Sequence, residues 1–296
     1  MTSITMTRLL ILMVFEILTF GFMQRALIAG VMIAIICSII GLFLVLKRHS
    51  LFGDAMSHVA FGGIAIGLFT NVYPLWTAFI VSVLAALGMT KLREFAKIPA
   101  DSAVAVLLSS GLAIGIVLIS LSGGFTLDLF SFLFGSILLV SVQDLLMILI
   151  VSSIVLAIIS LIYKGLTYVT FDEEQAAVGG LSVKNINYLF IVIASVTVIA
   201  SIKLVGVLLI SSLIVLPNIT AITMGKGFKK TAIISCGISA CSVIVGIIVS
   251  YIMNIAPSGA IVLTATAIFL TAVLGKHIVR KIRRSDINIQ DVTMSD

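Results

Sequence analysis

The sequence predicts an all-α integral membrane protein that crosses the bilayer about nine times. Of its 296 residues, 61% are hydrophobic and only 10% are charged, whereas roughly a quarter of the residues in a soluble domain are charged. Apolar stretches of about 20 residues recur along the chain, and this is the length that a helix needs to cross a bilayer. The basic residues also fall on alternate loops, as they do in multi-pass membrane proteins.

The apolar stretches define one transmembrane domain, residues 26–278, between an N-terminal interfacial segment, residues 1–25, and a tail, residues 279–296. The candidate spans are 26–46, 51–70, 75–92, 101–121, 142–162, 187–203, 205–224, 231–252 and 258–278. Two segments do not fit simple spans. Residues 8–22 are expected to form an interfacial helix or an extra span, and residues 126–139 are too short to cross, so we expect a re-entrant or interfacial helix there.

The distribution of charge predicts the orientation in the membrane. With these spans, one side of the membrane receives most of the Lys and Arg residues: Lys47, Arg48, Lys91, Arg93, Lys97, Lys164, Lys184, Lys226, Lys229, Lys230, Lys276, Arg280, Lys281, Arg283 and Arg284. Loops rich in Lys and Arg stay in the cytoplasm. We therefore expect a multi-pass protein of the cell membrane, plasma or inner, whose C-terminus is cytoplasmic.

An ionisable pair, Asp54 and His58, lies near the start of the second span. Residues four apart share one face of a helix, and ionisable groups within a membrane span are costly and indicate function. A carboxylate and an imidazole are ligands that divalent metal ions accept, and Ser57 offers a further oxygen nearby. A structural ion pair, or a helix cap formed by Asp54, is the alternative. Two ligands do not complete a metal site, so the others would come from another span, backbone carbonyls or water.

The loop after the fifth span carries the one acidic cluster between the predicted helices. Asp172 is followed by Glu173, Glu174 and Gln175, and Gly179-Gly180 comes a few residues later. We expect Asp172 to cap a short helix that ends at this glycine pair. A solvated loop is the alternative, but a short amphipathic helix on the cytoplasmic face suits docking to another subunit.

Two familiar enzymatic motifs are absent from the sequence. No Gly-x-x-x-x-Gly-Lys-Ser/Thr phosphate loop occurs, so the chain is not expected to hydrolyse ATP itself by the usual route. No His-Glu-x-x-His occurs either, which argues against a zinc-dependent intramembrane protease. The sequence thus favours a transport subunit over an enzyme.

Several short runs give the chain a family resemblance that extends over nearly its whole length. They are the run 51–63 with Gly53-Asp54-Ala55 and Ser57-His58, and the runs 98–104, 127–136, 172–176, 203–209 and 257–259. Together they resemble the permease subunits of metal-ion ABC transporters, the zinc/manganese/iron importer family. Members of this family are entirely helical, with a fold similar to that of the cobalamin-type importers.

The resemblance implies a homodimer of this subunit, two cytoplasmic ATP-binding subunits and an external metal-binding protein. Asp54 and His58 match positions regarded as metal ligands along the path, and no permanently bound cofactor is implied. The family's ATPase-coupling helix matches Asp172, Glu173, Glu174, Gln175 and Gly179. We expect transport of a divalent transition metal, with zinc placed first and manganese second.

Two other functions remain open from the sequence. An ATP-independent channel or secondary carrier would explain the spans and the ion pair, but it leaves residues 172–180 without a role. An ABC permease for a metal chelate, such as a siderophore or cobalamin, shares the architecture but needs no paired Asp and His.

Overall fold

The protein is described by a computed structural model that covers residues 19–122, 133, 135 and 140–293. For Ala100, Lys203, Leu204, Leu208 and the residues from 279 onward, the description is of the backbone alone. Most of the two segments predicted to be interfacial or re-entrant, residues 8–22 and 126–139, lies outside the described residues.

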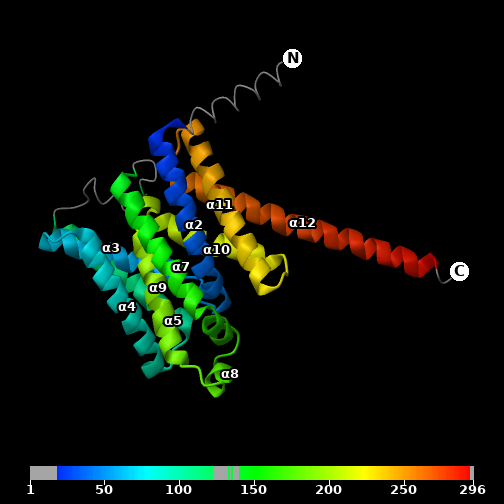
Figure 1. The fold of residues 1–296 in the computed structure, drawn as a ribbon, viewed down its shortest axis with the longest axis horizontal. Helices are drawn as coiled ribbons and strands as arrows, with labels where there is room; N and C mark the ends of the chain where they lie inside the picture. The colour runs from blue at the N-terminus through cyan, green and yellow to red at the C-terminus, as the bar shows by residue number, and fades with distance from the viewer. Residues whose placement is uncertain (1–18, 123–132, 134, 136–139, 294–296) are drawn as a thin grey trace, which may run out of the picture.

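The described residues are almost entirely helical (Figure 1). The helices are α2 (Gly21–Leu46), α3 (Phe52–Thr70), α4 (Pro74–Ala96), α5 (Ala100–Leu121), α7 (Val142–Phe171), α8 (Glu173–Val178), α9 (Val183–Val205), α10 (Val207–Thr223), α11 (Phe228–Met253) and α12 (Pro257–Thr293). Within the described part, eight of them are long and apolar enough to cross a membrane, and α10 carries a shorter apolar stretch, Leu209–Thr223. The predicted all-α class is confirmed, and each predicted span corresponds to one of these nine helices.

The helix boundaries differ from the predicted spans mainly where a helix continues past its apolar stretch. Helix α7 runs on to Phe171 rather than ending at 162, and the backbone of α12 stays helical to Thr293, through most of the predicted tail. Helix α2 begins at Gly21 rather than at 26. A hydropathy window detects the part of a helix that crosses the lipid, whereas the backbone hydrogen bonds that define a helix do not stop at the membrane surface.

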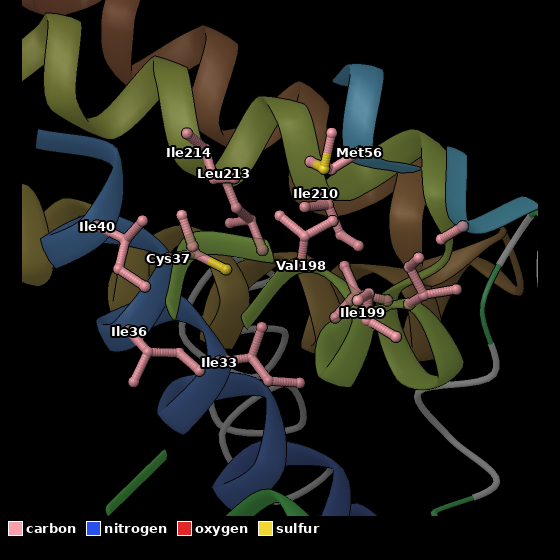
Figure 2. Close-up of a cluster of buried hydrophobic side chains, with 14 of the residues drawn as sticks. Ile33, Ile36, Cys37, Ile40, Met56, Val198, Ile199, Ile210, Leu213 and Ile214 are labelled. Atoms are coloured by element: carbon pink, nitrogen blue, oxygen red, sulfur yellow. The ribbon is translucent and has the colours of Figure 1, made fainter. Parts of the chain in front are cut away.

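The core lies where α2, α3, α9 and α10 meet (Figure 2). Side chains from all four helices interdigitate there: Ile33, Ile36, Cys37 and Ile40 from α2, Met56 from α3, Val198 and Ile199 from α9, and Ile210, Leu213 and Ile214 from α10. Helices α3 and α4 lie on one side of the bundle, and α11 and α12 lie on the other (Figure 1). Consecutive helices α9 and α10 are joined by the single residue Gly206, whose φ of 80° glycine adopts without strain.

The ends of the helices agree with the predicted alternation of loops. Lys47 at the end of α2, Arg93 near the end of α4, Glu173 in α8 and Asn187 at the start of α9 surround one cavity of about 1110 Å³. The opposite ends of α4, α7 and α9 line a second cavity of about 430 Å³, which includes Tyr73. Basic residues of three of the predicted cytoplasmic loops, Lys47 and Arg48, Arg93, and Lys184, therefore lie together at one end of the bundle.

Candidate functional site

Asp54 lies in the first turn of α3, a helix that is otherwise mostly buried in the bundle. The helix starts at Phe52, and its unpaired N–H groups make this turn a favourable place for a carboxylate. Gly53 allows α3 to approach α10 closely, since a Cβ atom there would lie 2.7 Å from Cδ1 of Ile214. The start of α3 is thereby fixed against the core.

His58 lies one turn further along, on the same face, as the sequence predicts. Its Nε2 is 3.7 Å from Oδ1 of Asp54, and the two side chains are 21% and 34% exposed respectively. This distance suits an ion pair but is longer than a good hydrogen bond, so both groups retain lone pairs for another partner. On a helix whose other faces are buried, these two ionisable side chains remain accessible.

Ser57, which the sequence suggests as an additional oxygen ligand, is oriented differently. Its side chain is fully buried, and its hydroxyl donates a 2.8 Å hydrogen bond to the carbonyl of Gly53. The serine therefore stabilises the first turns of α3 inside the bundle, and it does not share the accessible surface of Asp54 and His58.

Helix α5 holds the other side of α3 at the level of His58. A Cβ atom on Gly111 would lie 2.8 Å from the backbone N and Cα of Val59, and one on Gly62 would lie 2.8 Å from the carbonyl oxygen of Gly111. Such distances are shorter than real Cβ contacts, so the two backbones touch here with no side chain between them. The position of His58 therefore depends on two glycines that face each other.

In the described part of this chain, Asp54 and His58 are two side chains of the kind that bind metal ions, and they lie next to each other. Within that part, no group of three or more His, Cys, Asp or Glu side chains is close enough together to hold a metal ion. Asp144 forms a capping box with Ser141 at the start of α7, with an Oγ–Oδ2 distance of 2.7 Å. A metal ion bound to Asp54 and His58 would need further ligands from water, the backbone or another chain.

The acidic cluster forms the short helix α8, as predicted. Oδ1 of Asp172 accepts a 2.9 Å hydrogen bond from the backbone N–H of Gln175, and the helix ends at Val178 with Gly179 as its C-cap. Gly180 follows with a φ of 81°. The side chains of Glu174 and Gln175 are exposed, and Val178 is 91% exposed. Helix α8 thus presents both acidic and apolar side chains at one end of the bundle (Figure 1).

A polar network ties α8 to the ends of two long helices. Nζ of Lys47 lies 3.1 Å from Oε1 of Glu173 and donates a 2.6 Å hydrogen bond to Oδ1 of Asn187. Nδ2 of Asn187 in turn donates to Oε1 of Glu173 at 3.1 Å. Because Lys47 follows α2 and Asn187 lies in the first turns of α9, these three residues join α2, α8 and α9.

The network shifts the titration of both of its charged members. Burial raises the pKa of the Glu173 carboxyl, but the hydrogen bond from Asn187 and the charge of Lys47 outweigh burial, so this pKa lies below its usual value. Burial lowers the pKa of Lys47, and the attraction of Glu173 offsets only part of this effect. At neutral pH the glutamate is therefore held in its ionised form.

His49 is a buried histidine in the turn that leads from α2 into α3. Only 6% of its surface is exposed, and its Nε2 lies 3.2 Å from Nη1 of Arg93, where it accepts a hydrogen bond. Burial, followed by the nearby charges of Arg93 and Lys47, lowers the pKa of His49 to about 4. His49 is thus neutral at physiological pH. Sequence reasoning missed His49 and Asn187, and it used Lys47 and Arg93 only to assign the topology.

The fold and this site together define a multi-pass, all-helical membrane protein with an accessible acid–histidine pair on a buried helix. The chain belongs to the ABC 3 transport family, whose model matches residues 19–276. It is therefore a membrane subunit of the metal-transport type of ABC permease, and the resemblance in its sequence motifs is confirmed.

Named relatives cover most of the chain. It is 35% identical to a probable metal transport system membrane protein of Treponema pallidum, over 86% of this chain and 96% of the relative. It is 33% identical to the manganese transport system membrane protein MntC of Listeria monocytogenes, over 87% and 92% of the two chains. A probable iron transport system membrane protein of Haemophilus influenzae is also 33% identical, over 87% and 94%.

Solved structures agree with this assignment. The chain superposes on a chain of PsaBC from Streptococcus pneumoniae, solved with a Fab, with a TM-score of 0.77 and 31% identity over 88% of this chain and 93% of the other. It also matches a metal-chelate type ABC transporter in an inward-facing conformation, with a TM-score of 0.62 and 15% identity over 88% of each chain. The second likeness extends to the fold alone.

Proposed function

We propose that this chain is the membrane-spanning subunit of an ATP-driven importer of divalent transition-metal ions, and that Asp54 and His58 bind the ion on its way through. The observation that carries the proposal is the placement of this pair. Both side chains remain accessible on the otherwise buried helix α3, and 3.7 Å separates their nearest N and O atoms. A costly ionisable pair in a membrane protein is expected to serve transport.

The chemistry of the pair suits an ion in transit. A carboxylate oxygen is a hard ligand and an imidazole nitrogen a borderline one, so Mn²⁺, Fe²⁺ and Zn²⁺ are all accepted. Passage requires binding that is strong enough for entry and weak enough for release, and two protein ligands per chain satisfy this requirement. In a homodimer, which we also propose, a second copy of the pair or water molecules would complete the coordination.

We place manganese first among the candidate metals and zinc second. From the sequence, the resemblance of residues 57–63 to zinc-type members of the family places zinc first. However, the relatives in Listeria are named for manganese and that in Haemophilus for iron, and a coordination shell completed by water and carboxylate oxygens suits Mn²⁺ better than tetrahedral Zn²⁺.

Helix α8 is the proposed docking site for a cytoplasmic ATP-binding subunit. Its exposed face combines acidic side chains with the exposed apolar side chain of Val178. Glu173 is bonded through Lys47 to the end of α2, from which the turn containing His49 leads directly into α3. A displacement of α8 on ATP binding would therefore reach the start of α3, where Asp54 lies. An external metal-binding protein would deliver the ion to the opposite face.

Metal uptake by reconstituted complexes tests the proposal. Proteoliposomes containing the permease, its ATP-binding subunit and its external binding protein should accumulate ⁵⁴Mn²⁺ only when ATP is present. His58→Ala and Asp54→Ala should each lower uptake by at least about tenfold, because the loss of one of two protein ligands removes most of the site. The assembly of the subunits should be unchanged. Ser110→Ala, an exposed change on α5, is the matched control.

Three outcomes would contradict the proposal. Normal uptake by His58→Ala would exclude the pair from the path. ATP-independent uptake by the permease alone would indicate a channel or secondary carrier. Uptake of a metal chelate in preference to the free ion would indicate a chelate permease.

A further inference from the structure

A groove that the transport mechanism does not use lies between the last turns of α7 and the start of α11. It is an open surface groove with a volume of about 740 Å³. Its walls are mainly aromatic, and they are formed by Tyr163, Tyr168 and Phe171 of α7 and by Phe228 of α11. The ring centroid of Phe228 lies 6.1 Å from that of Tyr163 and 5.9 Å from that of Phe171.

Positive charge surrounds this aromatic groove. Lys164, Lys229 and Lys230 line it, their side chains are exposed, and no acidic residue is among the residues that line it. None of these lysines takes part in the ion pairs of the described residues. Helix α11 also begins here, after Gly227, without a side-chain cap. Its unpaired N–H groups and the positive end of its dipole add to the attraction for an anion.

Thr167 of α7 also lines the groove, between the aromatic side chains. Its hydroxyl oxygen is buried within the protein, so this residue presents little polar surface to the groove. The groove therefore offers an apolar wall and a cationic rim.

The position of the groove relative to the membrane identifies the ligand. It lies at the end of the bundle that carries the basic loops, and Tyr163 and Lys164 lie two turns before the end of α7 at Phe171. Tyrosine rings are enriched at the level of the lipid headgroups, and basic clusters at the cytoplasmic surface attract anionic lipids. We infer that this groove binds an anionic phospholipid of the inner leaflet, with an acyl chain along the aromatic wall and the phosphate at the three lysines and the start of α11.

Native mass spectrometry of the purified permease–ATPase complex tests this inference. The complex, in a non-ionic detergent, is supplied with phosphatidylglycerol or phosphatidylcholine at equal concentration. The wild type should retain phosphatidylglycerol in preference. The triple variant Lys164→Gln, Lys229→Gln, Lys230→Gln should lower its retention by at least about tenfold. The control Lys91→Gln, Lys97→Gln, Lys184→Gln removes the same charge from exposed positions away from the groove, and it should retain the lipid.

A second variant tests the groove without changing its charge. Thr167→Phe places a ring in the cavity and should reduce retention of the lipid at least about fivefold by excluding the acyl chain. Equal loss in the control triple variant would overturn the inference, because it would show diffuse attraction only. Retention of both lipids alike by the wild type would also overturn it.

Two further outcomes would identify a different occupant and likewise overturn the inference. Loss of the ATP-binding subunit from the groove triple variant in lipid-free detergent would show that the groove contacts that subunit. Displacement of phosphatidylglycerol by millimolar inorganic phosphate would show a site for a free anion rather than for a lipid.

Discussion

The contact between α3 and α5 predicts that a single methyl group at Gly111 destabilises the protein and impairs transport. The Cβ atom of Gly111→Ala would lie 2.8 Å from the backbone N and Cα of Val59 and 3.0 Å from the carbonyl carbon of His58. All three atoms belong to the backbone of α3 and cannot move aside like a flexible side chain. Helix α3 must therefore shift relative to α5, and His58 shifts with it.

The size of the effect follows from two opposing contributions. Replacing glycine by alanine within a helix stabilises it by about 0.5–1 kcal/mol. Overpacking of a tight contact costs about 1–3 kcal/mol. Gly111→Ala should therefore lower the free energy of unfolding by about 1–2 kcal/mol. Gly88→Ala is the matched control, because no atom lies within 4 Å of its Cβ position, and it should leave the stability unchanged or raise it.

Thermal unfolding in detergent with a thiol-reactive fluorogenic dye measures this difference. Cys37 is fully buried, so its labelling reports unfolding. We expect Gly111→Ala to unfold about 2–6 °C below Gly88→Ala and to take up less metal. A Gly111→Ala protein that is as stable as the control would refute the close contact between α3 and α5.

Three further predictions concern the polar groups around the site. His49 has a pKa of about 4 in the folded state and 6.5 when unfolded, so the unfolded chain binds a proton first as the pH falls. The free energy of unfolding should thus decrease by about 2 kcal/mol between pH 7.5 and 5, and His49→Gln should lack this decrease. The same dependence of unfolding free energy on pH in the wild type and in His49→Gln would refute the prediction. Glu173→Gln should reduce ATP-driven metal uptake. It should lower the free energy of unfolding by only about 0.5–1 kcal/mol, since the Glu173 side chain is 57% exposed. Glu174→Gln, at the exposed neighbouring position, is the control, and an equal loss of uptake in that variant would exclude a role for the Lys47–Glu173–Asn187 network. Asn218→Leu should lower the free energy of unfolding by about 2–3 kcal/mol, because the buried hydroxyl of Ser235 donates a 2.7 Å hydrogen bond to Oδ1 of Asn218 and would lose its acceptor. Chemical unfolding measures this change, and an unchanged denaturant midpoint would contradict a stabilising role for Asn218.

The spans and the accessible pair were predictable because each depends on local sequence. Bilayer thickness sets the length of an apolar stretch, so the positions of nine helices followed from hydropathy. Helical geometry places residues four apart on one face, so the pairing of Asp54 with His58 followed from their spacing. The cap of α8 by Asp172 likewise depends on residues that are neighbours in the sequence.

The polar network was not predictable, because its members come from distant parts of the chain. Lys47 and Glu173 meet only after α2 and α7 have packed side by side, and no motif marks Asn187 as their partner. The burial of His49 depends in the same way on the end of α4. Packing around a glycine also has no local signal: Gly62 lies against the backbone of α5, whereas Gly237, also in an apolar span, has nothing within 4 Å of its Cβ position.

The most direct test of the account is a spectroscopic measurement of the ligands of the transported ion. Pulsed electron paramagnetic resonance on Mn²⁺ bound to the complex, prepared with ¹⁵N-labelled histidine, detects an imidazole nitrogen in the coordination shell. A nitrogen coupling should be present in the wild type and in His49→Gln and should be lost in His58→Ala. A coupling that persists unchanged in His58→Ala would contradict the central claim that Asp54 and His58 bind the metal during transport.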